Sequence, residues 1–158
     1  RPASGLVVDG HIIVRLCTER EVGMQRFRYA RFDVADVLNK IRAGAPPMII
    51  AGFSVRVGTK RLSVFKLKGR KCVMCGLVGD RFYLEAQRAP VAPGVWGWRE
   101  PHLNLYGLDD AGQEVLMTID HILAQADGGS KEMSNLQPMC APCNVAKGSK
   151  KAKRYNGR

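Results

Sequence analysis

The sequence is short of acidic residues, of long apolar runs and of internal repeats. No apolar stretch approaches the roughly 18 residues that a membrane-spanning helix requires, and no segment has the charge and apolar pattern of a signal peptide. The 158 residues suffice for one domain, or for one domain with a small appendage. With 46% hydrophobic residues, the composition is that of an ordinary globular protein.

The shortage of acid leaves a strongly basic chain, with 25 Lys and Arg against 14 Asp and Glu and a net charge of +11. Such a chain attracts polyanions, nucleic acid first and acidic membrane surfaces second. Charge could serve solubility alone, but residues 60–71 and 147–158 each hold six cations and no acid. Clusters of this kind suit a surface that follows phosphates. The expected phosphate contacts are Lys66, Lys68, Arg70, Lys71, Lys147, Lys150, Lys151, Lys153 and Arg154.

Four of the five cysteines form two Cys-x-x-Cys pairs, Cys72 with Cys75 and Cys140 with Cys143. This spacing is typical of a structural zinc site with four thiolate ligands, because both sulfurs of a pair can turn toward one ion. Disulfides are the first alternative, but nothing in the sequence indicates an oxidising compartment. A redox pair is the second, and it would leave one Cys pair without a role. Cys17 follows an apolar strand pattern and is expected in the core.

The first third of the chain predicts mixed α and β structure without obvious chemistry. Residues 5–16 predict a hairpin around Asp9-Gly10. A helix is expected from Asp33 to Gly44, because its apolar residues recur at helical spacing. Residues 48–57 predict one further strand. This region could read a DNA site, form a dimer or complete the fold, and the sequence does not choose between these roles.

The middle of the chain predicts a strand over 81–88 and then a Pro/Gly-rich loop carrying Trp96 and Trp98. Packing of both tryptophans onto the body of the protein is the favoured prediction, and stacking on bases or sugars is the alternative. A hairpin is expected next, from strands beginning at His102 and at Glu114 with a turn at 109–112.

Residues 118–148 concentrate residue types that bind metals and transfer protons. A strand ends in Asp120-His121, and a loop follows in which Gly128-Gly129 permits a tight reversal. Residues 135–139 predict a short strand, and a helix is expected from about Ala141, since proline is tolerated in a first helical turn. The predicted order is strand, loop, strand, helix, with polar side chains converging.

This segment resembles the HNH, or ββα-metal, family of nucleases, and the likeness runs from Val115 to about Gly148. The matching residues are "DH" at 120–121, "NLQ" at 135–137 and "CxxCN" with its following lysine at 140–147. The resemblance implies that His121 is the general base and that Asn135 holds that histidine and braces the loop. It further implies one catalytic Mg²⁺ or Mn²⁺, held by Asp120 and Asn144. The products would be 5′-phosphate and 3′-hydroxyl ends.

The sequence departs from the family pattern at three places. The third signature position is Asn144 rather than His, and an amide oxygen suits Mg²⁺ better than imidazole does. The two Cys pairs are separated by residues 76–139, a longer stretch than in compact members of the family. Ala124 stands where many relatives carry Pro, a change from which we expect little.

The sequence therefore predicts an α+β protein with three regions: a mixed region at 1–70, a zinc-framed nuclease domain at 71–149 and a basic tail at 150–158. The expected partner is duplex or branched DNA, not a membrane. One active site cuts one strand, so cutting of both strands would imply two copies, as in a homodimer, or two visits by one copy. A zinc-stabilised nucleic-acid-binding module without activity is the alternative. The expected location is the cytoplasm, of a prokaryotic or phage type, or a nucleic-acid-associated site.

Overall fold

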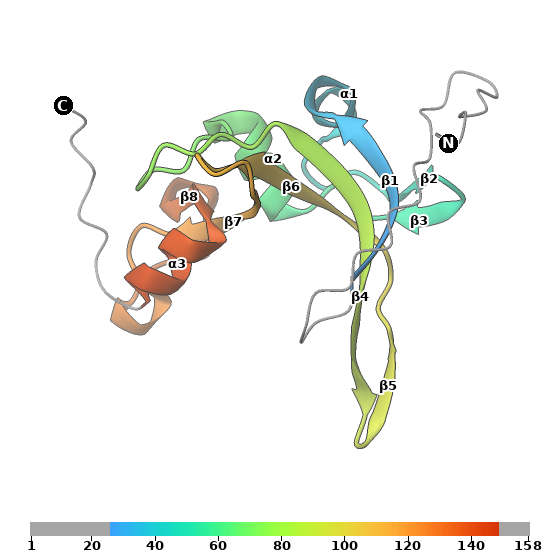
Figure 1. The fold of residues 1–158 in the computed structure, drawn as a ribbon. Helices are drawn as coiled ribbons and strands as arrows, with labels where there is room; N and C mark the ends of the chain where they lie inside the picture. Colours follow the sequence, from blue (N-terminus) through green and yellow to red (C-terminus); the bar gives the residue numbers. More distant parts are fainter. Residues whose placement is uncertain (1–25, 149–158) are drawn as a thin grey trace.

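The computed structural model describes residues 26–148 and confirms the α+β class. The predicted hairpin at 5–16, Cys17 and the tail from Lys150 lie outside the described residues. No helix within the described part of the chain is long and apolar enough to cross a membrane. The elements, shown in Figure 1, are β1 (Arg26–Asp33), α1 (Val34–Lys40), β2 (Met48–Ile50), β3 (Phe53–Val55), α2 (Lys60–Lys68), β4 (Arg81–Ala92), β5 (Val95–Trp98), β6 (His102–Leu108), β7 (Glu114–His121), β8 (Leu136–Cys140) and α3 (Ala141–Lys147).

One antiparallel sheet organises the molecule, with strand order β1-β4-β6-β7-β8 and with β5 paired to the far half of β4. β1 pairs with β4 through residues 26–33, so the region before the first Cys pair joins the sheet that carries the nuclease motif. β2 and β3 form a separate two-stranded sheet. α3 packs on β7 and β8 at the opposite end of the sheet order from β1.

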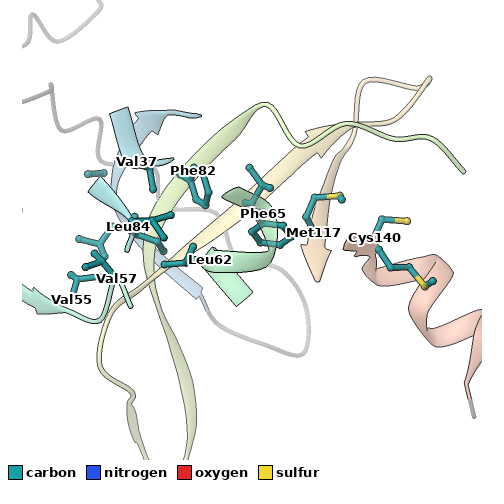
Figure 2. Close-up of a cluster of buried hydrophobic side chains, with 14 of the residues drawn as sticks. Val37, Val55, Val57, Leu62, Phe65, Phe82, Leu84, Met117 and Cys140 are labelled. Atoms are coloured by element: carbon teal, nitrogen blue, oxygen red, sulfur yellow. The ribbon is translucent and has the colours of Figure 1, made fainter. Parts of the chain in front are cut away.

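A continuous hydrophobic core connects these elements (Figure 2). α2 contributes Leu62 and Phe65, and β4 contributes Phe82 and Leu84, all at most 1% exposed. Met117 on β7 extends the core toward Cys140, which precedes α3. Each such large side chain contributes about 1.5–3 kcal/mol through its burial. The core thus holds Cys140 and Cys143, at the start of α3, against the rest of the molecule.

The predicted helix over 33–44 is shorter than expected. α1 ends at Lys40, and Ile41 has extended backbone angles of φ −73° and ψ 128°. Its side chain nevertheless stays fully buried, as the apolar spacing requires. Helical periodicity located the buried face correctly, but it did not show that the last apolar residue reaches the core from outside the helix.

The segment 48–57 forms the β2–β3 hairpin instead of one strand. Its turn residues Ala51 and Gly52 both have positive φ, of 50° and 82°. Two consecutive residues with positive φ match the twist of a hairpin, a geometry in which Asn-Gly is the usual signal. Ala-Gly is not that signal, and the turn was therefore missed.

The predicted loop around the two tryptophans is also a hairpin, because β4 continues to Ala92 and β5 returns along it. Trp96 is 58% exposed and Trp98 is 50% exposed. The predicted packing of both rings onto the body is therefore wrong, apart from an edge contact between Trp98 and Phe27.

Candidate active site and metal centre

β7, β8 and α3 form the strand–loop–strand–helix unit that the sequence predicts. The register of the two strands places Asp120 opposite Gln137 and His121 opposite Leu136. Asp120 is 6% exposed, whereas His121, the last residue of β7, is only half-buried. Because alternate residues of a strand share a face, Asp120 lies on the same face as Thr118, and His121 is directed differently.

Two side chains hold the Asp120 carboxylate. Gln137 Nε2 donates to Asp120 Oδ2 over 2.9 Å, and Lys147 Nζ donates to the same oxygen over 2.6 Å. Lys147 also donates to the backbone oxygen of His121. It is 7% exposed, so it lies inside the site as the counter-ion of Asp120 and not on the surface where a phosphate contact was predicted.

Asn144 reaches β7 from the first turns of α3. Its Nδ2 donates to Thr118 Oγ1 over 3.0 Å and to the backbone oxygen of Ile119 over 3.3 Å. Both bonds use the amide nitrogen, so they orient the amide oxygen without engaging it. Thr118 in turn donates to Met139 O on β8. Asn144 is thereby fixed to β7 directly and to β8 through Thr118.

Asp120 and Asn144 together offer oxygen ligands suited to a hard divalent cation. A carboxylate has about four lone-pair positions, so the two hydrogen bonds at Oδ2 leave acceptor capacity for an ion. Carboxylate and amide oxygens are ligands that Mg²⁺ and Mn²⁺ accept. The donor set therefore fits the cation that the resemblance implies.

The imidazole of His121 has a partner that the sequence did not single out. Gln125 Nε2 lies 2.8 Å from His121 Nε2, and the amide group donates, so the ring nitrogen accepts. Gln125 begins a 3-10 turn (Gln125–Asp127) four residues after the histidine. Only the presence of a polar side chain in the following turn could have indicated this contact.

Asn135 closes the loop that follows His121. Its Oδ1 accepts from Leu123 N over 2.9 Å, and its Nδ2 donates to Leu123 O over 3.0 Å and to Ser130 O over 2.7 Å. These contacts brace the loop, and none of them goes to the imidazole of His121. A Cβ at Gly129 would lie 1.9 Å from Leu123 O, so the loop closes only with glycine there.

The two Cys pairs come together as a four-sulfur cluster. The Sγ atoms of Cys72, Cys75, Cys140 and Cys143 all lie within 4.8 Å of one another. Cys75 Sγ and Cys140 Sγ are 3.7 Å apart, close to the ~3.8 Å edge of a tetrahedron with Zn–S distances of about 2.3 Å. The spacing of these sulfurs therefore fits one tetrahedral zinc ion.

Backbone hydrogen bonds shape the first Cys pair and attach it to β8. Gly76 N donates to Cys72 O over 3.0 Å, and Cys72 N donates to Leu77 O over 2.8 Å, which closes a tight turn. Val73 N donates to Pro138 O over 3.2 Å. The first Cys pair is thereby held beside the strand that leads to the second.

Burial and local hydrogen bonds act in opposite directions on the thiols. Burial raises the pKa of Cys140 and of Cys143 above the usual thiol value. Burial has the same effect at Cys72, but hydrogen bonds from the backbone around Cys75, Cys140 and Met74 outweigh it and lower the pKa of that thiol. One thiol is therefore prepared for deprotonation, which zinc binding requires of each cysteine ligand.

Residues 60–68 of the cationic cluster form α2, a helix that was not expected from the sequence. Thr59 caps it by accepting from Leu62 N. Its cations are largely engaged with backbone oxygens: Lys66 Nζ donates to Ile41 O over 2.7 Å, and Lys68 Nζ donates to Leu136 O over 2.6 Å. Arg70 donates to Gly79 O. A phosphate-binding role for Lys66, Lys68, Arg70 and Lys71 stays a prediction.

Comparison with known proteins agrees with the motif. Residues 108–150 match the family model described as HNH endonuclease. No curated protein and no solved structure matches the chain. The matched range contains β7, β8 and α3, the three elements that bring Asp120 and Asn144 together. Residues 108–150 are thus the part of the chain that is similar to HNH endonucleases.

Proposed function

We propose that this protein is a metal-dependent endonuclease that hydrolyses phosphodiester bonds of DNA to 5′-phosphate and 3′-hydroxyl ends. The observation that carries the proposal is the convergence of Asp120 and Asn144 on one face of β7, with His121 at the end of the same strand. The family match supports nuclease activity in general. The net charge of +11 supports a polyanionic substrate.

One Mg²⁺ or Mn²⁺ ion would be held by the carboxylate of Asp120 and the amide oxygen of Asn144. When bound, such an ion neutralises charge on the scissile phosphate and on the departing oxygen. The four thiolates would hold a separate zinc ion with no open position, which makes that ion structural.

His121 acts as the general base and takes the proton of the attacking water at Nε2. Proton transfer by a positioned base contributes about 10²–10⁴-fold to the rate. Gln125 donates to that nitrogen in the free protein, so its amide moves aside when water takes its place. Asn135 keeps the loop after His121 closed, which fixes the direction in which the imidazole points.

Lys147 stabilises the buried Asp120 carboxylate. Burying a charge without a partner is costly, and the ammonium at 2.6 Å offsets that cost. The lysine thereby holds the Asp120 carboxylate in place before any metal binds. This role replaces the phosphate contact that the sequence predicts for Lys147.

DNA would be held by cations outside this buried pair. The tail residues Lys150, Lys151, Lys153 and Arg154 follow directly after α3 and are the first candidates. The exposed Lys71, beside the first Cys pair, is another. Contacts of this kind hold the phosphate backbone whatever its sequence.

Incubation of supercoiled plasmid with the purified protein tests the proposal. Cleavage is expected with Mg²⁺ or Mn²⁺ and is expected to stop in EDTA. Relaxed circles would indicate cutting of one strand, and linear product would indicate both strands. DNA binding without cleavage under every metal condition would instead favour a zinc-stabilised nucleic-acid-binding module.

A further inference from the structure

The hairpin of β4 and β5 extends beyond the rest of the sheet as a two-stranded arm (Figure 1). Residues 81–85 of β4 lie between β1 and β6, and the pairing with β1 continues to Gln87. Residues 88–92 pair with β5, and no other described strand pairs with them. We call residues 88–98 the arm. It lies outside the matched HNH segment, and the cleavage chemistry described above does not use it.

Both tryptophans of the chain lie on this arm and on one face of it. Trp96 and Trp98 are two residues apart in β5, so their side chains share a face. Their directly paired neighbours on β4 are Pro90 and Arg88. Trp96 is 58% exposed and Trp98 is 50% exposed. Two large indoles left half in water on one face indicate a surface that something else covers.

A row of aromatic rings connects this face to the body of the protein. The rings of Trp98 and Phe27 meet edge to face with centroids 6.3 Å apart. Phe27 contacts Tyr29 at 4.8 Å, and Tyr29 contacts Phe53 at 4.4 Å. Tyr29 and Phe53 also pack against the core. Trp98 is thus in edge contact with a ring that is itself connected to the core, and the rest of its indole stays open to solvent.

The positive charge of the arm favours an anionic partner. Residues 86–99 contain Arg88 and Arg99, both exposed, and no acidic residue. At the base of the arm a hollow of about 370 Å³ is lined by three arginines, Arg56, Arg61 and Arg99, and by one acid, Glu100, which lies 4.0 Å from Arg56. Exposed aromatic rings beside cations match a nucleic-acid strand, whose bases stack on rings while its phosphates meet the positive charges.

We propose that the arm binds unpaired nucleobases, with Trp96 and Trp98 as stacking surfaces and with Arg88 and Arg99 near the phosphates. Stacking on an exposed ring requires a base outside a duplex, so the partner is single-stranded nucleic acid or an unpaired region of a substrate. The inference rests on the proposed function for its class of partner, and it adds a preference for substrates with open bases.

The experiment uses the two tryptophans as its own reporters, since the chain has no others. The full chain, in EDTA so that no cleavage occurs, is titrated with a fluorescein-labelled single strand of ~12 nucleotides, within the range of known site sizes. A second titration uses the same sequence as a duplex at the same salt concentration. We expect the single strand to quench tryptophan emission as anisotropy rises, and the duplex to quench it less.

Substitutions separate stacking from charge and from folding. Trp96→Leu and Trp98→Leu keep an apolar strand residue but remove the ring, and each should weaken single-strand binding about 5- to 150-fold. Trp96→Tyr should retain much of the affinity. Val95→Ala is the matched control, because Val95 is 53% exposed on the opposite face of β5, and it should bind like the wild type. Far-UV circular dichroism checks that each variant is folded.

Several results would overturn the inference. If anisotropy rises without tryptophan quenching, the nucleic acid binds at a site other than the arm. The same conclusion follows if the leucine variants bind like the wild type. Emission that changes with protein concentration and without DNA would mean that a second copy covers the arm. Plasmid cleavage by the same preparation with Mg²⁺ keeps the two questions apart: cleavage without quenching refutes the arm alone, and quenching without cleavage refutes the nuclease alone.

Discussion

The ammonium of Lys147 lies 2.6 Å from Asp120 Oδ2, and both side chains are almost wholly buried. The pair joins the end of α3 to β7 and places a fixed positive charge beside the carboxylate that we expect to bind the catalytic ion. Removing one partner of a buried ion pair leaves the other charge without compensation. The site therefore depends on this lysine even though its ammonium is buried against Asp120 and not exposed to solvent.

Lys147→Met should lower the free energy of unfolding of the metal-free protein by about 3–5 kcal/mol. The methionine fills similar space but leaves the Asp120 carboxylate buried without a cation. Urea unfolding in EDTA measures the change. Val145→Ala is the control, because Val145 lies on the same helix and is 83% exposed, and exposed substitutions change stability by at most about 0.5 kcal/mol.

The same variant should respond more strongly to metal. In Lys147→Met the divalent ion takes over from the lost ammonium as the cation beside Asp120, so saturating Mg²⁺ should raise the melting temperature more than it does in the wild type. Equal shifts in the two proteins would show that the ammonium and the metal do not share the carboxylate.

Zinc should be required for folding of the described domain. Binding of a structural zinc ion contributes on the order of 10 kcal/mol, and the four cysteines connect the start of the middle region to α3. Metal analysis should find one zinc per chain in the wild type and in Cys17→Ser. Cys140→Ser should lose both the zinc and the cooperative unfolding transition. A zinc-free protein that stays folded and active would refute the assignment.

Asn135→Ala should open the loop after His121. The substitution removes three hydrogen bonds to Leu123 and Ser130, which together contribute roughly 2–4 kcal/mol. Asn135→Asp keeps the acceptor for Leu123 N but turns a carboxylate oxygen toward the carbonyl oxygens of Leu123 and Ser130, so it should open the loop as well. Hydrogen exchange at the Leu123 amide measures the opening. Protection that is unchanged in the alanine variant would contradict a bracing role.

The motif segment was predictable because its chemistry is local. The spacing of Asp120, Asn135, Asn144 and the second Cys pair predicts strand, loop, strand and helix without reference to the rest of the chain. The sequence did not predict the directions in which the side chains point. Lys147 looks like a surface cation in sequence, and only the packing of α3 on β7 turns it inward.

The rest of the fold depends on contacts between distant segments. The pairing of β1 with β4 brings together residues far apart in the chain, and no local pattern indicates it. The cluster at 60–71 was interpreted by charge, although its buried Leu62 and Phe65 make it a core helix. Pro90 and Gly94 suggested a loop where β4 and β5 form the arm.

Deletion of residues 150–158 should weaken DNA binding at all sequences alike. The deletion removes five cations, Lys150, Lys151, Lys153, Arg154 and Arg158. Each phosphate neutralised on duplex DNA contributes up to ~0.9 to the slope of log affinity against log salt, so the slope should become shallower by roughly 2–4. Binding of one duplex across a salt series measures it. An unchanged slope would show that the tail makes no phosphate contacts and that other cations, such as Lys71, make them.

The most direct test of the central claim is cleavage of plasmid by His121→Ala in Mg²⁺, compared with the wild type at matched zinc content and matched DNA binding. If His121 is the general base, the variant should bind DNA with nearly unchanged affinity and cut it at least about 10²-fold more slowly. A variant that cuts at the wild-type rate would contradict the account, because the proton would then leave the attacking water by another route.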